Sequence, residues 1–313
     1  MGNKLKPKNL LWLITEQCNL RCKYCRFSQS QSTSELTLDE GLNLLHKGRL
    51  LNYERVIFSG GEPFLRDDLM ILLTSSLQMD YKVNINTNGT LITESLAKEL
   101  CALPLSEIVI SLDSTSTEND FYRGFTSRVV EAIKCLINYK NPTTSISTET
   151  VVHQQNYKLL NNIYRSLKNL GVDNITFHTI HLTKNHKHYE NLAIPPMVEK
   201  DKRDLFEAML PWAKETGYVK YVDFLQQFFC GYNVEAVKCQ IPRILTIIRS
   251  NGDVFPCFDR EDLLIGNVRN KPLDAIIENE KLKRYYNEIQ NARCLSQHCL
   301  YMFKFGLRDK RMK

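Results

Sequence analysis

Three cysteines fall within eight residues, at Cys18, Cys22 and Cys25, and their spacing is C-x3-C-x2-C. Thiolates bind both zinc and the irons of iron–sulfur clusters, so this segment could hold either. Zinc sites usually join a C-x2-C pair to a second pair of Cys or His, yet no His occurs in the twenty residues after Cys25. The spacing therefore favours an iron–sulfur cluster over zinc, and it favours both over three unrelated structural cysteines.

The surrounding segments predict how these cysteines are positioned. Residues 9–15 (NLLWLIT) form an apolar run that is typical of a buried parallel strand. Five more strands are predicted to alternate with helices, at residues 55–59, 82–87, 107–112, 145–152 and 174–180. This alternation predicts right-handed βαβ units around a parallel sheet, with too few units for an eight-stranded barrel. The cysteines then lie at the carboxyl end of the first strand, where α/β folds place their sites.

Three helix-end signals support these boundaries. Thr37 and Glu40 have the spacing of a capping box, and Thr93 is placed to cap the helix after the third strand. Gly171 follows the helix predicted over residues 157–170, in the position where a left-handed residue commonly ends a helix.

The cysteine spacing resembles that of the radical S-adenosylmethionine (SAM) superfamily. The resemblance implies that Cys18, Cys22 and Cys25 hold three irons of a [4Fe–4S] cluster, and that the fourth iron binds the amino and carboxylate groups of SAM. It also implies a partial (β/α)6 barrel, similar to a TIM barrel. The implied activity is reductive cleavage of SAM to a 5′-deoxyadenosyl radical, which abstracts a hydrogen atom from a substrate.

The sequence Gly60-Gly61-Glu62-Pro63 follows the second predicted strand. Two glycines allow a close approach of the backbone to a ligand, although Gly-Gly on its own also fits a simple turn. The segment is similar to the GGEP motif of the superfamily, which meets the amino group of SAM. The resemblance thus implies that its carbonyl oxygens and the Glu62 carboxylate bind this amine.

Other candidate SAM-binding residues lie near the predicted strand ends. The resemblance implies that Tyr24 contacts adenine, although its ring could also shield the cluster from water. Asn88 fits either a turn or a ribose contact. Ser111 and Asp113 end the fourth strand, and Arg123 follows them. A guanidinium suits the SAM carboxylate because both groups are two-pronged, and the alternative for Arg123 is a surface ion pair.

A second cysteine system lies near the C-terminus. The pattern Cys239-x12-Gly252-x4-Cys257 is similar to the opening of the SPASM and Twitch extensions of radical SAM enzymes. Cys294 and Cys299 could complete four ligands for one auxiliary [4Fe–4S] cluster, which makes the single-cluster Twitch type the closer match. A four-cysteine zinc site is the alternative, because the same thiolates suit both metals.

The predicted elements also change in the C-terminal part. A charged helix is predicted over residues 200–216, a hairpin around Asn251-Gly252, and a helix over residues 272–290. Pro256 suggests that the second hairpin arm is an edge strand. We therefore expect a radical SAM barrel in residues 1–195, a helical linker in residues 196–236, and a small iron–sulfur domain of hairpin plus helix in residues 237–313.

The remaining cysteines and the histidines give weaker signals. Cys230 lies outside both cysteine systems, so it is a buried structural residue, a hydrogen-atom donor to a substrate radical or an extra cluster ligand. Cys101 and Cys135 fall on predicted helices and fit the core. His178 and His181 end the sixth predicted strand, and alternation along the strand allows at most one of them to face the barrel interior.

Composition limits the function classes. The chain has 313 residues, 43% of them hydrophobic, ten cysteines and a net charge of +6. No export signal or membrane-length apolar run is evident, so we expect a cytoplasmic protein with no membrane partner. Lys and Arg are scattered apart from the tail, and nucleic acid is not an expected partner.

We expect an enzyme that modifies a peptide or a small natural product and takes its electron from a flavodoxin- or ferredoxin-type donor. A leader-binding domain has no room before the strand at Asn9, so a peptide would have to bind without one. The alternatives are a dehydrogenase of a sugar or aminocyclitol, a cyclase of cofactor biosynthesis and, outside enzymes, an iron–sulfur binding or sensor protein.

Overall fold

The computed structural model describes residues 7–25, 34–117, 120, 122–182, 184–231, 239–258, 260 and 262–291. Nine strands of this part form one sheet in the order β6-β5-β4-β3-β2-β1-β7-β8-β9. The six predicted strands are all present and parallel: β1 (Asn9–Thr15), β2 (Arg55–Gly60), β3 (Lys82–Thr87), β4 (Glu107–Ser111), β5 (Ser145–Val152) and β6 (Asn174–Thr179). The predicted α/β class and partial barrel are therefore confirmed.

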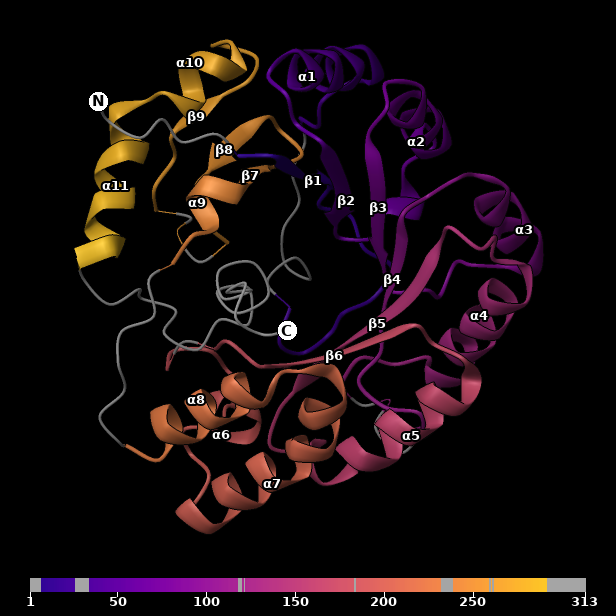
Figure 1. Ribbon diagram of the computed structural model, residues 1–313, viewed down its shortest axis with the longest axis vertical. Helices are drawn as coiled ribbons and strands as arrows, with labels where there is room; N and C mark the ends of the chain where they lie inside the picture. The colour runs from indigo at the N-terminus through magenta and orange to yellow at the C-terminus, as the bar shows by residue number, and fades with distance from the viewer. Residues whose placement is uncertain are drawn as a thin grey trace.

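Helices cover the convex face of the curved sheet, as Figure 1 shows. The five helices between the parallel strands are α1 (Leu38–Leu50), α2 (Leu69–Gln78), α3 (Glu94–Ala102), α4 (Thr126–Tyr139) and α5 (Leu160–Leu170). Alternate strand residues such as Trp12, Phe58 and Ile85 are fully buried. Burial of this apolar side of each strand under the helices is the main source of the fold's stability.

The helix ends follow the sequence signals. Thr37 and Glu40 form the capping box at the start of α1, and the Thr93 hydroxyl accepts a hydrogen bond from the Leu96 N–H at the start of α3. Gly171 ends α5 with a φ of 89°, a left-handed conformation that favours glycine. All three predicted caps are confirmed.

The concave face is polar at the amino ends of the strands. Arg55 donates to Asn84 (2.7 Å), Asn84 donates to Glu107 (2.7 Å), and Ser147 donates to the other oxygen of Glu107 (2.6 Å). Asn174 extends this line with a hydrogen bond to Ser147 (3.1 Å). The line crosses the amino ends of β2 to β6, and its polar side chains satisfy one another by hydrogen bonds. A cavity of about 430 Å³, lined in part by Glu107 and Asn174, opens at this end.

The C-terminal part extends the same sheet. Strand β7 (Leu245–Ile248) pairs in parallel with β1, and β8 (Asp253–Phe255) and β9 (Gly266–Asn267) follow in antiparallel order. The hairpin predicted at Asn251-Gly252 is confirmed, with Gly252 at a φ of 88°. The prediction of an edge strand is wrong, because β8 pairs on both sides and Pro256 comes after its last residue.

The remaining helices are α6 (Tyr189–Leu192), α7 (Glu199–Thr216), α8 (Val219–Phe229), α9 (Ile241–Ile244), α10 (Leu273–Ile277) and α11 (Glu280–Asn291). The single helix predicted over residues 272–290 is wrong, because Asn279 interrupts it. The Asn279 side chain accepts from the Lys281 N–H (2.8 Å) and donates to the Ile265 carbonyl (2.8 Å). It thus starts α11 anew and ties it to the strand region. No helix in the described part of the chain is long and apolar enough to cross a bilayer.

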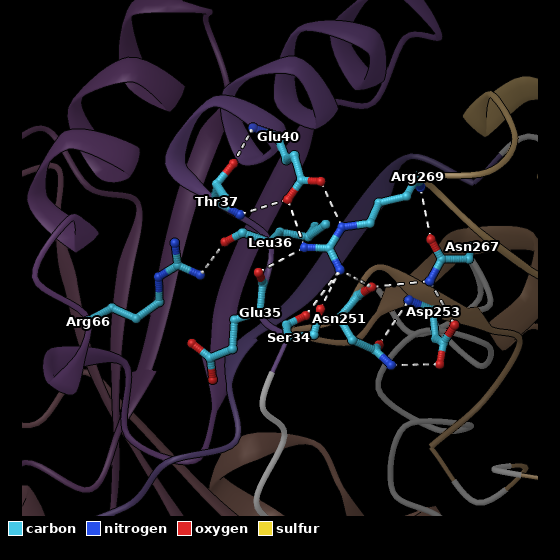
Figure 2. A network of polar contacts seen from close by, with 10 residues as sticks. All are labelled: Ser34, Glu35, Leu36, Thr37, Glu40, Arg66, Asn251, Asp253, Asn267 and Arg269. Atoms are coloured by element: carbon cyan, nitrogen blue, oxygen red, sulfur yellow. Dashed lines mark hydrogen bonds and ion pairs between the residues drawn. The ribbon is translucent and has the colours of Figure 1, made fainter.

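Polar contacts join the C-terminal strands to the start of α1 (Figure 2). We call these contacts the seam; they are made by Arg269, which follows β9, and by Ser250, which follows β7. The Arg269 guanidinium binds both oxygens of Glu40 (2.7 and 2.8 Å) and the backbone carbonyls of Ser34 (3.1 Å) and Glu35 (2.9 Å). The Leu36 N–H donates to the Ser250 carbonyl (2.6 Å) in the same seam. These contacts join residues more than two hundred positions apart in the sequence.

Candidate active site at the carboxyl ends of the strands

The cysteine loop leaves the carboxyl end of β1, as the sequence predicts. Cys18 and Cys25 are half-buried, and Cys22 is buried. The Cys18 sulfur accepts hydrogen bonds from the Leu20 N–H (3.4 Å) and the Asn88 amide (3.8 Å). Burial raises the pKa of the Cys22 thiol to about 11. A thiol in this setting becomes a thiolate readily only when a metal supplies positive charge.

Zinc and an iron–sulfur cluster place different demands on these three thiolates. Among the described residues, no three Cys, His, Asp or Glu side chains lie close enough to share one metal ion. A single zinc ion requires such convergence. The three thiols lie near enough to interact electrostatically, because Cys18 and Cys25 both raise the pKa of Cys22. A [4Fe–4S] cluster takes each of three thiolates on a different iron, so this donor set fits such a cluster.

The two glycines after β2 allow this strand end to touch the cysteine loop. Gly61 donates its N–H to the Thr15 carbonyl (2.8 Å), and Glu62 donates its N–H to the Gln17 carbonyl (2.8 Å). A Cβ on Gly61 would lie 2.1 Å from the Gln17 oxygen, and one on Gly60 would lie 2.3 Å from the Thr15 oxygen. Any side chain here would push the cysteine loop away from β2.

The carboxylate of Glu62 joins the ends of two strands. It is fully buried, and it accepts hydrogen bonds from the Thr87 hydroxyl (2.8 Å), the Asn88 N–H (2.8 Å) and the Phe64 N–H (3.2 Å). Burial raises the pKa of this carboxyl group, against the effect of those donors. Pro63 next to it is also buried, whereas the two preceding glycines are half-buried. The glycine backbone is thus more open to a ligand than the Glu62 side chain is.

Asn88 links β3 to the cysteine loop. Its amide nitrogen donates to the Asn19 side chain (2.8 Å), and its amide oxygen accepts from the Thr90 N–H (2.9 Å). The amide nitrogen of Asn19 in turn donates a hydrogen bond to the hydroxyl of Thr90 (2.8 Å). This closed network fixes the Asn88 side chain against Cys18, so the residue is more than a turn former.

Asp113 is the centre of a buried polar cluster at the ends of β4 and β5. It accepts hydrogen bonds from the Arg123 Nε (2.8 Å), the Tyr24 hydroxyl and the Val151 N–H (2.9 Å). Burial raises the pKa of Asp113, but the charge and hydrogen bonds of Arg123 outweigh it and hold the pKa below its usual range. Ser111, half-buried at the end of β4, lies two residues before it.

Arg123 therefore forms an ion pair, but the pair is buried and is not the surface ion pair that the sequence allowed as an alternative. Its side chain is 14% exposed and that of Asp113 is 6% exposed. The guanidinium carbon also lies 5.6 Å from the centre of the Tyr24 ring, within the range of a cation–π contact. Asp113 takes two of the five N–H groups of Arg123, at its Nε and Nη2. The guanidinium is held rigidly beside the cysteine loop.

The rings of His153 and Tyr122 also belong to this cluster, and the sequence predicted neither of them. The centre of the His153 ring lies 6.1 Å from that of Tyr24 and 5.1 Å from that of Tyr122. The Tyr122 carbonyl accepts from the Lys23 N–H (3.0 Å), which ties this segment to the cysteine loop. His153 directly follows the last residue of β5. That position at a strand's carboxyl end was the one signal in the sequence that could have identified it.

The second cysteine system is described only in part. Cys239 lies two residues before α9 and Cys257 lies two residues after β8, and both are buried. Cys294 and Cys299 lie outside the described residues. Cys230 directly follows α8 as its C-cap residue, and its side chain forms a hydrogen bond with Glu199 on α7.

The two cysteines predicted for the core lie on helices, as expected. Cys101 is buried on α3, where its thiol donates to the Leu136 carbonyl (3.6 Å), and Cys135 on α4 is half-buried against the core. Neither belongs to the strand-end site.

Two sequence families match separate parts of the chain. Residues 12–167 match the radical SAM superfamily, and residues 239–300 match the SPASM iron–sulfur cluster-binding domain. The AdoMet-dependent heme synthase of Methanosarcina barkeri is 24% identical, over 94% of this chain and 89% of its own length. A cofactor-modifying protein of the tungsten-containing aldehyde ferredoxin oxidoreductase of Pyrococcus furiosus is 28% identical, over 88% and 82%.

Solved structures show the same fold. The chain superposes on AdoMet-bound anSMEcpe with a TM-score of 0.68 at 19% identity, covering 94% of this chain and 87% of that one. Streptococcus suis SuiB bound to S-adenosylmethionine gives a TM-score of 0.72 at 18% identity, covering 94% and 70%. The cofactors of these domains are SAM, a [4Fe–4S] cluster and auxiliary iron–sulfur clusters. The chain belongs to the radical SAM superfamily, with a SPASM-type iron–sulfur domain after its partial barrel.

Proposed function

We propose that this chain is an enzyme that cleaves SAM reductively and abstracts a hydrogen atom from a peptide or a small natural product. One observation supports this most directly: the ends of β2, β3 and β4 all meet the loop that carries Cys18, Cys22 and Cys25. When bound, the cluster and SAM supply electron transfer and a 5′-deoxyadenosyl radical. The protein positions the reactants and excludes water.

The half-buried backbone of Gly60 and Gly61 is our proposed site for the SAM amine, because Glu62 is covered and already joins β2 to β3. Arg123 is our proposed partner for the SAM carboxylate. Its pairing with Asp113 prevents it from swinging away, and the remaining N–H groups can meet a second carboxylate.

Tyr24, Asn88 and Ser111 are our proposed contacts for the adenosyl group. The Tyr24 ring is held by its hydroxyl on Asp113 and by the guanidinium of Arg123 over its face. Asn88 is fixed by its own network, and Ser111 ends the neighbouring strand. A site with side chains locked in this way needs little reorganisation when the cofactor binds.

We infer a single auxiliary [4Fe–4S] cluster in residues 237–313, with Cys239 and Cys257 as ligands together with Cys294 and Cys299. The buried state of the first two supports this assignment. We retain the division into residues 1–195, 196–236 and 237–313 as a proposal, in which β7 is the part of the third segment that pairs with β1. The auxiliary cluster would accept an electron from the substrate radical or hold the substrate.

A peptide substrate is supported by relatives of the same fold. SuiB has been solved bound to its precursor peptide SuiA, at a TM-score of 0.72 to this chain. The PqqA peptide cyclase of Granulibacter bethesdensis is 26% identical over 52% of this chain. Modification of a tetrapyrrole or another cofactor is the second candidate, because the heme synthase of M. barkeri aligns over 94% of the chain. We place either reaction in the cytoplasm, with a flavodoxin- or ferredoxin-type electron donor.

Iron content and SAM cleavage test this function. Anaerobically reconstituted protein should hold about eight irons, four per cluster. Replacing Cys18, Cys22 and Cys25 by Ala should leave about half of that iron and abolish 5′-deoxyadenosine formation after dithionite reduction. Cys135→Ala is the matched control, because Cys135 lies on α4 and should leave both readouts unchanged. Full iron retention in the triple variant, or zinc in place of iron, would contradict the assignment.

A further inference from the structure

His153 has an unexplained polar atom. Its ring is 1% exposed, and Nδ1 accepts a hydrogen bond from the Gln155 N–H (3.2 Å). In a neutral imidazole this arrangement places the proton on Nε2. The Nε2 atom is buried, and no hydrogen-bond partner for it exists among the described residues. A buried N–H without an acceptor costs free energy, so native proteins usually provide one.

The ring is held in place by its surroundings. The His153 backbone N–H donates to the Asn156 side chain (2.9 Å). The Asn156 amide in turn donates to the carbonyls of Asp113 (3.2 Å) and Val151 (2.9 Å). These bonds fix the backbone of His153 against the ends of β4 and β5, and the hydrogen bond from the Gln155 N–H to Nδ1 fixes the orientation of the ring.

The neighbours of the ring indicate what kind of acceptor is missing. The ring is a neighbour both of Tyr24, which we propose as an adenine contact, and of Tyr122, which is tied to the cysteine loop. Burial lowers the pKa of His153 to about 4, so the group is a neutral donor at physiological pH. A buried neutral N–H beside aromatic rings can donate to an uncharged acceptor, such as a ring nitrogen of a purine, without the desolvation cost that a further buried carboxylate would carry.

We propose that the Nε2–H of His153 donates a hydrogen bond to an acceptor nitrogen of the adenine of SAM. This inference rests on the proposed function, since it requires SAM to bind at the strand ends. His153 is then a positioning residue that fixes the adenosyl group against Tyr24. The competing explanation is that the ring only packs, with its N–H directed at the face of Tyr122, a weak contact that many ring types could replace.

Binding measurements on three variants separate these explanations. His153→Leu keeps the volume but removes the donor, whereas His153→Gln can place an amide N–H near the position of Nε2. His153→Asn can replace only the function of Nδ1. The cluster-loaded protein is titrated with SAM and, separately, with methionine, which lacks adenine. Iron content and thermal unfolding are measured on each variant to show that it is folded and loaded.

We expect the SAM dissociation constant to rise about tenfold in the Leu and Asn variants and by less than about threefold in the Gln variant. Methionine affinity should be the same in all four proteins. Equal SAM affinity in the wild type and in the Leu or Asn variant would overturn the proposal and leave His153 as a packing residue. If the Leu variant does not fold, the Asn and Gln pair decides by the same criterion. Failure of the wild type to bind SAM would instead overturn the proposed function, and this inference with it.

Discussion

Two arginine–carboxylate pairs of similar length lie in very different surroundings. The Arg123 and Asp113 side chains are 14% and 6% exposed, with 2.8 Å between Nε and Oδ2. The Arg269 and Glu40 side chains are 29% and 36% exposed, with 2.7 Å between Nε and Oε1. The first pair lies beside the cysteine loop. The second joins the segment after β9 to α1 (Figure 2). Distance alone therefore does not show what each pair does.

Burial determines how much free energy of unfolding is lost when one partner of each pair is removed. Removal of one partner from a buried pair leaves a charge that water cannot solvate, which is costly. Removal of one partner from an exposed pair leaves a charge that water solvates well. The buried pair thus makes the site geometry difficult to change, whereas the seam can lose its pair and still hold together through backbone contacts such as that between Leu36 and Ser250.

The largest expected effect is that of Arg123→Ala. We expect it to lower the free energy of unfolding by ~3–5 kcal/mol, because ionised Asp113 stays buried without its partner. Urea unfolding of the apo protein measures this directly. Adding Asp113→Asn to the Arg123→Ala variant should recover part of the loss, since the lone charge is then gone. A loss below about 1 kcal/mol in the single variant would place this pair in the same class as the exposed one.

The same variant also bears on the cofactor. If Arg123 binds the SAM carboxylate, the Ala variant should bind SAM roughly ten- to hundredfold more weakly under conditions where it remains folded. SAM titration with iron content as a control measures this. Unchanged affinity would restrict Arg123 to its role in holding Asp113 and Tyr24.

The contrast between the pairs also shows where sequence reasoning reaches its limit. Asp113 and Arg123 are both recognisable from their positions near the fourth strand, but their pairing depends on how the loop between them folds back. Arg269 and Glu40 are 229 residues apart, and nothing local in the sequence connects them. Side-chain partners of this kind are set by tertiary packing, which a single sequence does not display.

The elements themselves were more predictable. The strands β1 to β6 and the caps at Thr37, Thr93 and Gly171 depend on residues that are neighbours in the sequence. The pairing of β7 with β1 was not predicted, because a four-residue apolar strand carries no information about its partner. His153 was missed because one His after a strand has no spacing motif, and only the buried Nε2 marks it.

A smaller effect is expected for Arg269→Ala. An exposed pair contributes about 1 kcal/mol or less to stability, although the two backbone carbonyls that Arg269 also binds bring the effect to the upper end of that range. The loss should shrink in high salt, which screens exposed charges but has little effect on the buried pair. Urea unfolding of both arginine variants at low and high salt measures this difference. Equal salt dependence in the two variants would mean that burial does not distinguish the pairs.

The smallest expected effect is the pH dependence of the seam. Hydrogen bonds from Arg269 lower the pKa of Glu40 to about 2, from 4.5 in an unstructured chain. Because the folded-state pKa is the lower one, the stabilisation from Glu40 is complete above about pH 4.5 and is lost as the pH falls toward 2. Its size is limited because Glu40 is 36% exposed and water screens the pair.

Unfolding of the wild type and of Glu40→Gln, compared from pH 7 down to pH 2, isolates this contribution. Gln cannot be ionised, so the wild type should be the more stable protein at neutral pH, and the difference should fall toward zero in acid. Asp113 also has a lowered pKa and weakens the fold in acid, but it does so equally in both proteins and cancels in the difference. A stability difference that stays constant across this range would show that Glu40 acts through its shape and capping contacts with Thr37, and that its charge contributes nothing to the seam.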